Sequence, residues 1–403
     1  MRIKCFSQNR YQSLNNNFCC TNCNSKDKKE YVEGINLDNY PSAIYQRINV
    51  NRYREQDLTE KKAKKIHDCL IGGALGDAFG RPVEILKNDQ IKEYYGKDGI
   101  QDLATVGLKA RITDDTQMTM YTADGLIKSM IKNPDSKEPD YEIIYKSYQD
   151  WYKTQTEEFC DTKRKGLLNE MPDLYSPVGP GKTCLGSLKL GIRGSIEKPI
   201  NNSNKCGGIM RVAPVGLAYD DPEIAFKVGA ECAAMTHGGP EAYLPAGFYA
   251  ALISEIANGK DIDKAAIDSL NILSKYDNHE KTYNLLSKAM NLSQSDVPSD
   301  EAILSLGSGF YGDEAMAISL YSALKEPDNL KNALILAVNH SGDSDSTGSI
   351  TGQIVALSKG IDTVPKEWID SLEMSELLKN LAKDLASPID IKNKESKYPL
   401  EYV

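Results

Sequence analysis

Apolar residues recur every three or four positions along most of this chain, and this helical spacing restricts its fold more than any other feature. Residues 241–256 are apolar almost all round, which predicts a buried central helix. The alternating patterns of strands are scarce, and turn dipeptides that would join hairpins are rarer still. The clearest stripes are Met120, Ala123, Ile127 and Ile131, then Leu330, Ala333, Leu334 and Ala337, and finally Ile350, Ile354 and Leu357. The sequence therefore predicts an all-α fold, a compact bundle of many helices.

The pattern changes close to residue 58. Residues 1–57 are rich in Asn, Lys and Tyr and lack sustained periodicity, so we expect a polar, disordered tail there. Thr59 can cap the helix that follows, because its side-chain oxygen suits a helix N-terminus. We therefore expect one helical domain over residues 58–385 and a polar C-terminal extension over residues 386–403.

Four of the nine cysteines lie in the N-terminal tail. Cys19, Cys20 and Cys23 are close together, and Cys5 lies upstream of them. Structural zinc needs four well-spaced ligands, but this spacing is irregular and no second CxxC pair follows. A solvated tail is therefore favoured over a zinc site.

Net charge and cysteine usage limit the partners and the compartment. The net charge of -9 argues against a general nucleic-acid surface. Cysteines scattered singly through apolar segments, such as Cys69, Cys184 and Cys232, favour reduced thiols inside the cell over a disulfide framework. The N-terminal residues lack the apolar core of a signal peptide, and no run approaches the ~18 apolar residues of a membrane span. We therefore expect a soluble monomer in the cytoplasm or nucleus, with neither nucleic acid nor membrane as a partner.

Two acidic runs stand at the starts of helical stripes: Thr-Asp-Asp-Thr at residues 113–116 and Asp-Ser-Asp-Ser-Thr at residues 343–347. Helix capping explains one or two oxygens at each start, since Asp, Ser and Thr satisfy free backbone N–H groups. If the two starts converge, however, their four carboxylates would repel one another strongly unless a cation lay between them. Such hard oxygen ligands suit Mg²⁺, or Mn²⁺ in its place, and two ions could share a bridging carboxylate. Spacing alone leaves open whether the runs meet.

Four motifs in sequence order point to one family. They are Gly-Gly-Ala-Leu-Gly-Asp-Ala-Phe-Gly at residues 72–80, Ile-Thr-Asp-Asp-Thr-Gln-Met at 112–118, Cys-Gly-Gly-Ile-Met-Arg at 206–211 and His-Ser-Gly-Asp-Ser-Asp-Ser-Thr-Gly at 340–348. Together they resemble the ADP-ribosylglycohydrolase family, and the resemblance covers residues 67–359. This family includes ADP-ribosylarginine hydrolases and the bacterial glycohydrolase that reactivates dinitrogenase reductase.

The resemblance implies a site for two Mg²⁺ ions. Its ligands fall on Thr113, Asp114, Asp115, Asp343, Asp345 and Ser346. Relatives often carry Thr at the last of these positions, and Ser supplies the same oxygen with one methyl group fewer. Glu84 matches a mobile glutamate of the family, although a plain surface charge behind Pro82 is the alternative. The catalytic base is either Asp115 or Glu84, and the sequence does not separate them.

Other positions resemble the family's binding site for ADP-ribose. Gly207 and Gly208 let backbone N–H groups approach phosphate oxygens, although a tight turn would also need them. Cys206, directly before them, stands where relatives often carry Asn, which puts one hydrogen bond in doubt. His237 matches a histidine near the distal ribose and phosphate, with a helix C-cap as the alternative. The resemblance also places three further residues near the diphosphate: Ser203, Gly181 and Thr183. Two aromatic residues, Phe310 and Tyr311, either stack on adenine or belong to the core.

The chemistry that the resemblance implies is hydrolysis of a glycosidic bond of ADP-ribose. Metal ions on the ribose hydroxyls would position the sugar for attack by water, and carboxylates would stabilise an oxocarbenium-like transition state. The form of the second acidic run favours ADP-ribosylated arginine on proteins as substrate, whereas the short spacing at Glu84 favours other branches. ADP-ribosyl-serine or O-acetyl-ADP-ribose is therefore the alternative substrate. A non-catalytic ADP-ribose-binding or crystallin-like protein is the third hypothesis, and the retained metal-position oxygens argue against it.

Overall fold

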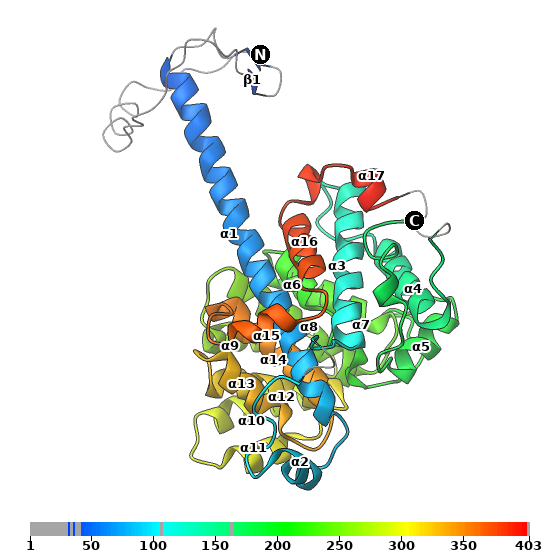
Figure 1. The fold of residues 1–403 in the computed structure, drawn as a ribbon, viewed down its shortest axis with the longest axis vertical. Helices are drawn as coiled ribbons and strands as arrows, with labels where there is room; N and C mark the ends of the chain where they lie inside the picture. The colour runs from blue at the N-terminus through cyan, green and yellow to red at the C-terminus, as the bar shows by residue number, and fades with distance from the viewer. Residues whose placement is uncertain (1–30, 33–34, 37–41, 105–107, 162–164, 401–403) are drawn as a thin grey trace. The chain divides into compact units, whose positions relative to one another are not determined.

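Helices make up nearly all of the regular structure in the computed structural model of this chain (Figure 1). The structure describes residues 31–32, 35–36, 42–104, 108–161 and 165–400. The α-helices are α1 (Ser42–Gly80), α2 (Asn88–Tyr95), α3 (Asp114–Lys132), α4 (Tyr141–Thr156), α5 (Lys182–Lys189), α6 (Ala213–Ala218), α7 (Pro222–Ala234), α8 (Pro240–Ala257), α9 (Ile262–Leu273), α10 (Glu280–Ser293), α11 (Ser299–Leu306), α12 (Gly312–Lys325), α13 (Leu330–Val338), α14 (Ser344–Lys359), α15 (Lys366–Ser371), α16 (Ser375–Ala386) and α17 (Lys394–Lys397). The 3-10 helices are η3 (Arg81–Val83), η5 (Pro172–Leu174), η6 (Cys206–Gly208) and η7 (Pro388–Asp390). The all-α prediction is confirmed.

The chain divides into two units, residues 1–57 and residues 58–403. In the described part of the first unit, β1 (Tyr31–Val32) and β2 (Ile35–Asn36) pair as a short antiparallel hairpin. The cysteine cluster falls on residues 1–30, which lie outside the described residues. Disorder was predicted for the whole of residues 1–57, but residues 42–57 lie in helix α1.

Helix α1 begins at Ser42, well before Thr59. Thr59 therefore lies inside a helix, and the prediction that it caps the first helix is wrong. Residues 42–71 contain neither Gly nor Pro, so nothing in their sequence interrupts a helix. Their polar composition hides the helix from a search for apolar stripes, because that search detects only helices with a buried face.

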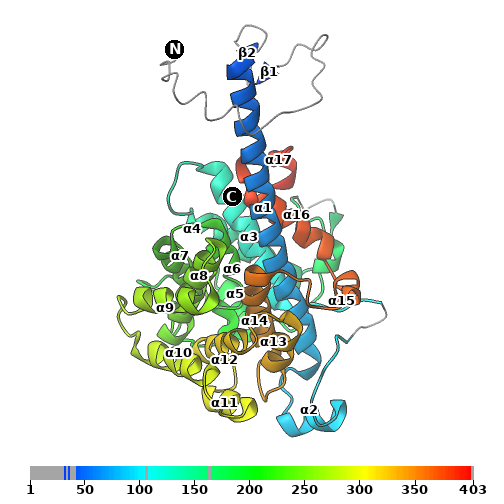
Figure 2. The same ribbon diagram turned by 90° about the vertical axis from the view of Figure 1, so that its left-hand side faces the viewer.

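Helix α8 is the buried centre that the sequence predicts. Every side chain from Leu244 to Ile256 is buried, and the helix packs against α6, α7, α9, α12 and α14 (Figures 1 and 2). Small residues permit the closest approach, since a Cβ on Gly229 of α7 would lie 2.5 Å from Ala250 Cβ of α8. Each large side chain buried in this way contributes roughly 1.5–3 kcal/mol to folding.

Glycines bring α1 directly against α14. Gly76 faces the carbonyl of Gly348, and Gly80 faces the carbonyl of Ser344, so closely that a Cβ on either glycine would overlap the opposite backbone. Later residues of α1 meet earlier residues of α14, so the two helices run antiparallel. This contact places the C-terminal end of α1 beside the N-terminal end of α14.

The C-terminal residues include a buried anchor. Tyr398 is fully buried, and its hydroxyl donates to Asp384 of α16 at 2.8 Å. The 3-10 helix η7 contacts α3. The polar extension expected over residues 386–403 thus packs on the domain as far as the structure describes it, to residue 400. No helix in the described ranges is long and apolar enough to span a bilayer.

Candidate active site

The two acidic runs meet at the N-termini of α3 and α14. Helix α3 begins at Asp114 with Thr113 as its N-cap, and α14 begins at Ser344 with Asp343 as its N-cap. The two helices contact each other, and Asp115 lies close enough to Asp343 for their charges to interact. The acids separated by more than two hundred positions in sequence therefore share one region of the fold.

Burial and mutual repulsion dominate the electrostatics of this carboxylate cluster, which comprises Asp114, Asp115, Asp343 and Asp345. Burial is the largest cause of a pKa well above the ordinary value at Asp114, Asp115 and Asp345, and neighbouring carboxylates add to the shift. The side chains of Asp115 and Asp345 are only 2% and 4% exposed. Four carboxylates in such a space cannot all ionise without a compensating cation.

Helix capping explains the Thr113 hydroxyl but not these carboxylates. Thr113 Oγ1 accepts the Asp115 amide at 3.2 Å, as an N-cap residue does. Asp343 makes no side-chain cap bond to α14 and instead accepts the Cys206 thiol at 2.9 Å. Asp115 Oδ1 is buried and has no hydrogen-bond partner among the described residues. The carboxylates are thus arranged for something other than ending their own helices.

Asp77, on α1, belongs to this site, although the sequence-based prediction gave it no role. Its carboxylate is fully buried and accepts the backbone amides of Thr113 at 2.9 Å and Thr116 at 3.1 Å. The Thr116 hydroxyl donates to it as well. Burial raises the pKa of Asp77 to about 6, against the opposing effect of these hydrogen bonds. A single acid inside an apolar, glycine-rich helical run was the signal that could have identified it.

Glu84 lies beside the carboxylate cluster and not on open surface. It directly follows η3 and shares a hydrogen bond with Asp345. Burial raises the pKa of Glu84 to about 7, and Asp343 and Asp77 add to the increase. The next residue, Ile85, has a φ of 60°, which is strained for a β-branched side chain. The surface-charge alternative for Glu84 is therefore not supported.

Cys206 fills the place where relatives often carry Asn without leaving its neighbours unpaired. Its thiol donates to Asp343, and the Ser346 hydroxyl lies 3.9 Å from its sulfur. Ser346 also shares a hydrogen bond with Asp115. The thiol and the hydroxyl therefore connect the carboxylates of α3 with those of α14.

The chemistry of this donor set fits a hard divalent cation. Carboxylate and hydroxyl oxygens are the ligands that Mg²⁺ and Mn²⁺ prefer, and Asp115 Oδ1 is a buried oxygen with nothing to satisfy it. In the described ranges, no group of three or more His, Cys, Asp or Glu side chains already has the arrangement of a metal-ion site. The carboxyl groups instead bond to neighbouring donors, as Asp343 does with Cys206 and Asp345 with Glu84.

Three of the residues predicted near the diphosphate lie next to the carboxylate cluster. The Gly181 amide, at the N-terminus of α5, donates to Asp114 Oδ2 at 3.0 Å. Thr183, in the first turn of the same helix, has its Oγ1 3.4 Å from Ser203 Oγ. The backbone of Gly181 and the hydroxyls of Thr183 and Ser203 are therefore brought together at one edge of the site.

The glycines of the third motif face His237. A Cβ on Gly207 would lie 3.1 Å from His237 Cε1, and a Cβ on Gly208 would lie 3.5 Å from His237 Cβ. Burial lowers the pKa of His237 to about 3, so the ring is neutral at pH 7. The C-cap residue of α7 is Met235, and the His237 ring has its Nδ1 2.8 Å from Thr236 Oγ1, so the C-cap alternative is wrong.

Phe310 and Tyr311 lie against Lys205. The Lys205 ammonium is 4.0 Å from the centre of the Tyr311 ring and 5.7 Å from that of Phe310. Tyr311 is 41% exposed, which excludes the core alternative for its ring. The Phe310 carbonyl accepts the Cys206 amide at 3.2 Å, so these aromatics are fixed to the third motif.

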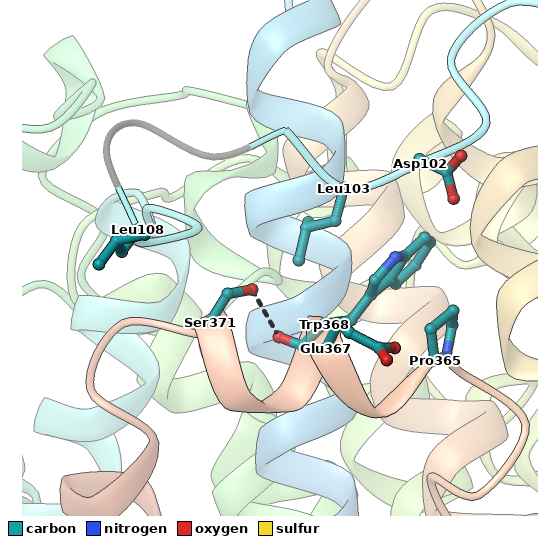
Figure 3. Close-up of a pocket in the computed structure, with 7 residues that line it drawn as sticks. All are labelled: Asp102, Leu103, Leu108, Pro365, Glu367, Trp368 and Ser371. Carbon is teal, nitrogen blue, oxygen red and sulfur yellow. Dashed lines mark hydrogen bonds between the residues drawn. The ribbon is translucent and has the colours of Figure 1, made fainter.

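A surface pocket of about 460 Å³ lies elsewhere in the domain (Figure 3). Side chains from the segment before α3 and from α15 line it, among them Leu103, Leu108 and Trp368. None of the predicted site residues contributes to this pocket, so its apolar lining has no part in the site described above.

Comparisons with known proteins identify one family and one fold. The family model described as ADP-ribosylglycohydrolase matches residues 58–394. "ADP-ribosylarginine hydrolase Tri1" of Serratia proteamaculans is 22% identical, over 80% of this chain and 78% of that protein. "ADP-ribosylhydrolase ARH3" of Homo sapiens is 24% identical, over 81% of this chain and 93% of that protein. A solved "ADP-ribosylglycohydrolase-related protein complex" matches with a TM-score of 0.55 at 21% identity, covering 82% of this chain and 99% of its own, which supports the same fold.

Proposed function

The chain belongs to the ADP-ribosylglycohydrolase family, enzymes that hydrolyse glycosidic bonds of ADP-ribose, and we propose that it releases ADP-ribose from modified arginine side chains of proteins with Mg²⁺ as its cofactor. The observation that carries this proposal is the meeting of two helix N-termini around the buried carboxylate cluster. Either helix start alone would be ordinary capping. Together they concentrate more negative charge than a buried site tolerates without a cation.

The residues that would hold the metal ions are Thr113, Asp114, Asp115, Asp343, Asp345 and Ser346. When bound, Mg²⁺ or Mn²⁺ would supply positive charge that neutralises the cluster and orients the ribose hydroxyls. Asp77 and Thr116 keep the start of α3 in place for this task. The unpaired oxygen of Asp115 supports the assignment, because a buried carboxylate oxygen without a partner is costly unless a ligand completes it.

Hydrolysis breaks the bond between the ribose anomeric carbon and the arginine nitrogen, and the water oxygen takes the place of that nitrogen. One proton of the water passes to a carboxylate base, and a proton is delivered to the departing nitrogen. Asp115 is one candidate base, because its Oδ1 is free to accept a proton. Glu84 is the other, because its raised pKa of about 7 suits proton exchange near neutral pH.

The remaining site residues suit the nucleotide part of the substrate. Backbone N–H groups at Gly207 and Gly208 and the hydroxyls of Ser203 and Thr183 offer hydrogen bonds to phosphate oxygens. The exposed Tyr311 ring offers a face on which adenine can stack. Two of the segments that carry these groups contact the carboxylate cluster directly, α5 through the bond from Gly181 to Asp114 and η6 through the bond from Cys206 to Asp343.

Arginine as the acceptor is supported by charge. Glu84 lies beside the cluster but outside the proposed metal ligands, and its carboxylate favours a cationic side chain as the leaving group, since a guanidinium pairs well with a carboxylate. The alternative, release from serine or cleavage of O-acetyl-ADP-ribose, is favoured by the short spacing at Glu84.

The test is a comparison of substrates. Purified full-length protein is incubated with arginine-modified peptide, serine-modified peptide and O-acetyl-ADP-ribose, each with Mg²⁺ and each with a chelator. We expect ADP-ribose release from arginine that stops when the metal is removed. Release from serine alone would reject arginine as the acceptor, and release that a chelator leaves unchanged would reject the metal.

A further inference from the structure

Arg211 is a buried cation without an acidic partner. It is fully buried, and no carboxylate in the described ranges lies within ion-pair distance of its guanidinium. Its Nη2 donates to the Cys232 carbonyl at 3.0 Å and to Thr236 Oγ1 at 2.7 Å, and its charge lies over the Tyr148 ring. Burying an unpaired guanidinium is expensive, so a chain that keeps one there calls for an explanation.

The contact with Thr236 decides the direction of the next hydrogen bond. Thr236 Oγ1 accepts from Arg211 and lies 2.8 Å from His237 Nδ1. Thr236 is fully buried, and its hydroxyl has no other acceptor among the described residues. If the hydroxyl proton did not point to His237 Nδ1, it would be left unpaired in the interior, which is unfavourable. Thr236 therefore donates to Nδ1, and the ring proton of neutral His237 sits on Nε2.

That proton is directed at the glycines of the third motif. A Cβ on Gly207 would lie 3.2 Å from His237 Nε2, a tighter contact than Cβ atoms usually make, so a glycine keeps this side of the ring open. His237 Nε2 has no hydrogen-bond partner among the described residues. The ring thus presents a free N–H donor beside backbone groups that suit phosphate oxygens.

We propose that Arg211 and Thr236 form a relay that fixes His237 as the tautomer with its proton on Nε2, and so make His237 a hydrogen-bond donor to an oxygen of the ADP-ribose diphosphate. This inference rests on the proposed function and adds two positioning residues that act through His237. Burial keeps the imidazole neutral, and the nearby guanidinium also disfavours a second positive charge. A neutral N–H donor with a fixed orientation binds an acceptor oxygen in one position, whereas a flexible cationic side chain can bind oxygens in several positions.

Other residues hold the main chain of Thr236, so the role of its hydroxyl can be tested separately. The Thr236 carbonyl accepts from Ser187 Oγ and from Asn201 Nδ2, each at 2.8 Å. The Thr236 main chain is therefore held independently of its hydroxyl, and Thr236→Val removes the relay while keeping the shape of the side chain. Thr236→Ser keeps the hydroxyl. Thr282→Val is the matched control, because Thr282 is also fully buried but its hydroxyl has no partner in the described structure.

The first measurement is the imidazole ¹⁵N spectrum of the full-length protein at neutral pH. The chain has four histidines, and a His237→Asn variant identifies the signals of His237. We expect wild-type His237 to be neutral, with Nε2 protonated and Nδ1 bare. A proton on Nδ1, or on both nitrogens, would overturn the proposal.

The second measurement is the affinity for ADP-ribose, by calorimetry, for the wild type and the three threonine variants. We expect Thr236→Val to weaken binding about tenfold, as loss of one fixed donor to an anionic oxygen implies, while Thr236→Ser and Thr282→Val bind like the wild type. Equal affinities for Thr236→Val and the wild type would overturn the relay and leave the proposed function intact. A wild type that neither binds nor releases ADP-ribose would reject the proposed function and this inference with it.

Discussion

Asp77 Oδ2 lies 2.9 Å from the backbone nitrogen of Thr113, although 36 positions separate the two residues. The bond fastens α1 to the start of α3, and the glycines of α1 fasten it to the start of α14. The glycine-rich motif thus has an assembly role. It holds the two acidic helix starts in register, so that their carboxylates form a single cluster.

Asp77→Asn tests this assembly role. The amide group of Asn presents a donor where two backbone N–H groups and a hydroxyl need acceptors, so we expect a loss of about 1–3 kcal/mol in unfolding free energy. Hydrolytic activity should fall as well, because the start of α3 would move. Thermal unfolding and a rate assay measure the two effects.

The control for that variant is Asp68→Asn on the same helix. Asp68 is also buried, but its carboxylate pairs with Lys64 and lies 3.1 Å from His67 Nδ1, so it has no bond to the start of α3. We expect this control to keep its activity. Equal activity in the two variants would show that Asp77 has no special part in the site.

Gly80→Ala tests the close contact between α1 and α14. The new Cβ would overlap the Ser344 carbonyl, and overpacking of this kind costs about 1–3 kcal/mol. The displaced start of α14 should also lower activity. Gly186→Ala in α5 is the matched control, because nothing lies within 4 Å of its new Cβ. That substitution should raise stability by roughly 0.5–1 kcal/mol, and a similar loss in both variants would refute the close-contact argument.

Local patterns allowed part of this structure to be predicted. The buried helix α8 and the starts of α3 and α14 follow from apolar spacing and from capping residues, which act within one or two turns of helix. The start of α1 was missed, because its residues are mostly polar and show no periodic apolar pattern in the sequence.

Partners far apart in sequence could not be predicted. The bond between Cys206 and Asp343 joins residues 137 positions apart, and only the folded chain brings them together. Asp77 was overlooked for the same reason, since its partners lie on another helix. The family resemblance supplied the metal positions, but not the relay from Arg211, which depends on a single hydroxyl orientation.

Stability should depend on pH in a direction set by the raised carboxyl pKa values. The pKa of Glu84 rises from 4.5 to about 7, and the pKa of Asp77 rises from 3.8 to about 6. The other buried carboxyls of the cluster have raised pKa values too, whereas the lowered pKa values of His237 and His340 act in the opposite direction. Because the raised carboxyls outnumber the two histidines, the metal-free native state binds more protons than the unfolded state between about pH 4 and pH 7. Its stability therefore falls as pH rises through that window. We expect metal-free protein to melt at a higher temperature near pH 5 than near pH 8.

Magnesium should reverse much of this loss, because a cation compensates the ionised carboxylates near pH 8 and competes with protons near pH 5. Melting curves at both pH values, with Mg²⁺ and with a chelator, measure the effect. Glu84→Gln should flatten the metal-free pH dependence. A metal-free melting temperature that stays constant or rises with pH would contradict this electrostatic description.

Glu314 should influence metal affinity through the loop that holds Asp343. Its Oε2 accepts the Ser308 amide and hydroxyl, both at 2.9 Å, and the Ser308 carbonyl accepts the Asp343 amide at 2.9 Å. We expect Glu314→Ala to raise the Mg²⁺ concentration for half-maximal activity about tenfold, as loss of an outer hydrogen-bond partner does at metal sites. Glu301→Ala, an exposed acid on α11, should leave it unchanged. Equal Mg²⁺ requirements in both variants would rule out this support.

The most direct test of the whole account is the rate at which Asp343→Ala releases ADP-ribose from an arginine-modified peptide at saturating Mg²⁺. Asp343 is the N-cap residue of α14 but makes no side-chain cap bond, so its removal takes a carboxylate from the cluster and breaks no cap bond. We predict a fall of about a thousandfold, or about 4 kcal/mol of transition-state stabilisation. A variant that turns over like the wild type would show that the meeting of the two acidic helix starts has no part in catalysis.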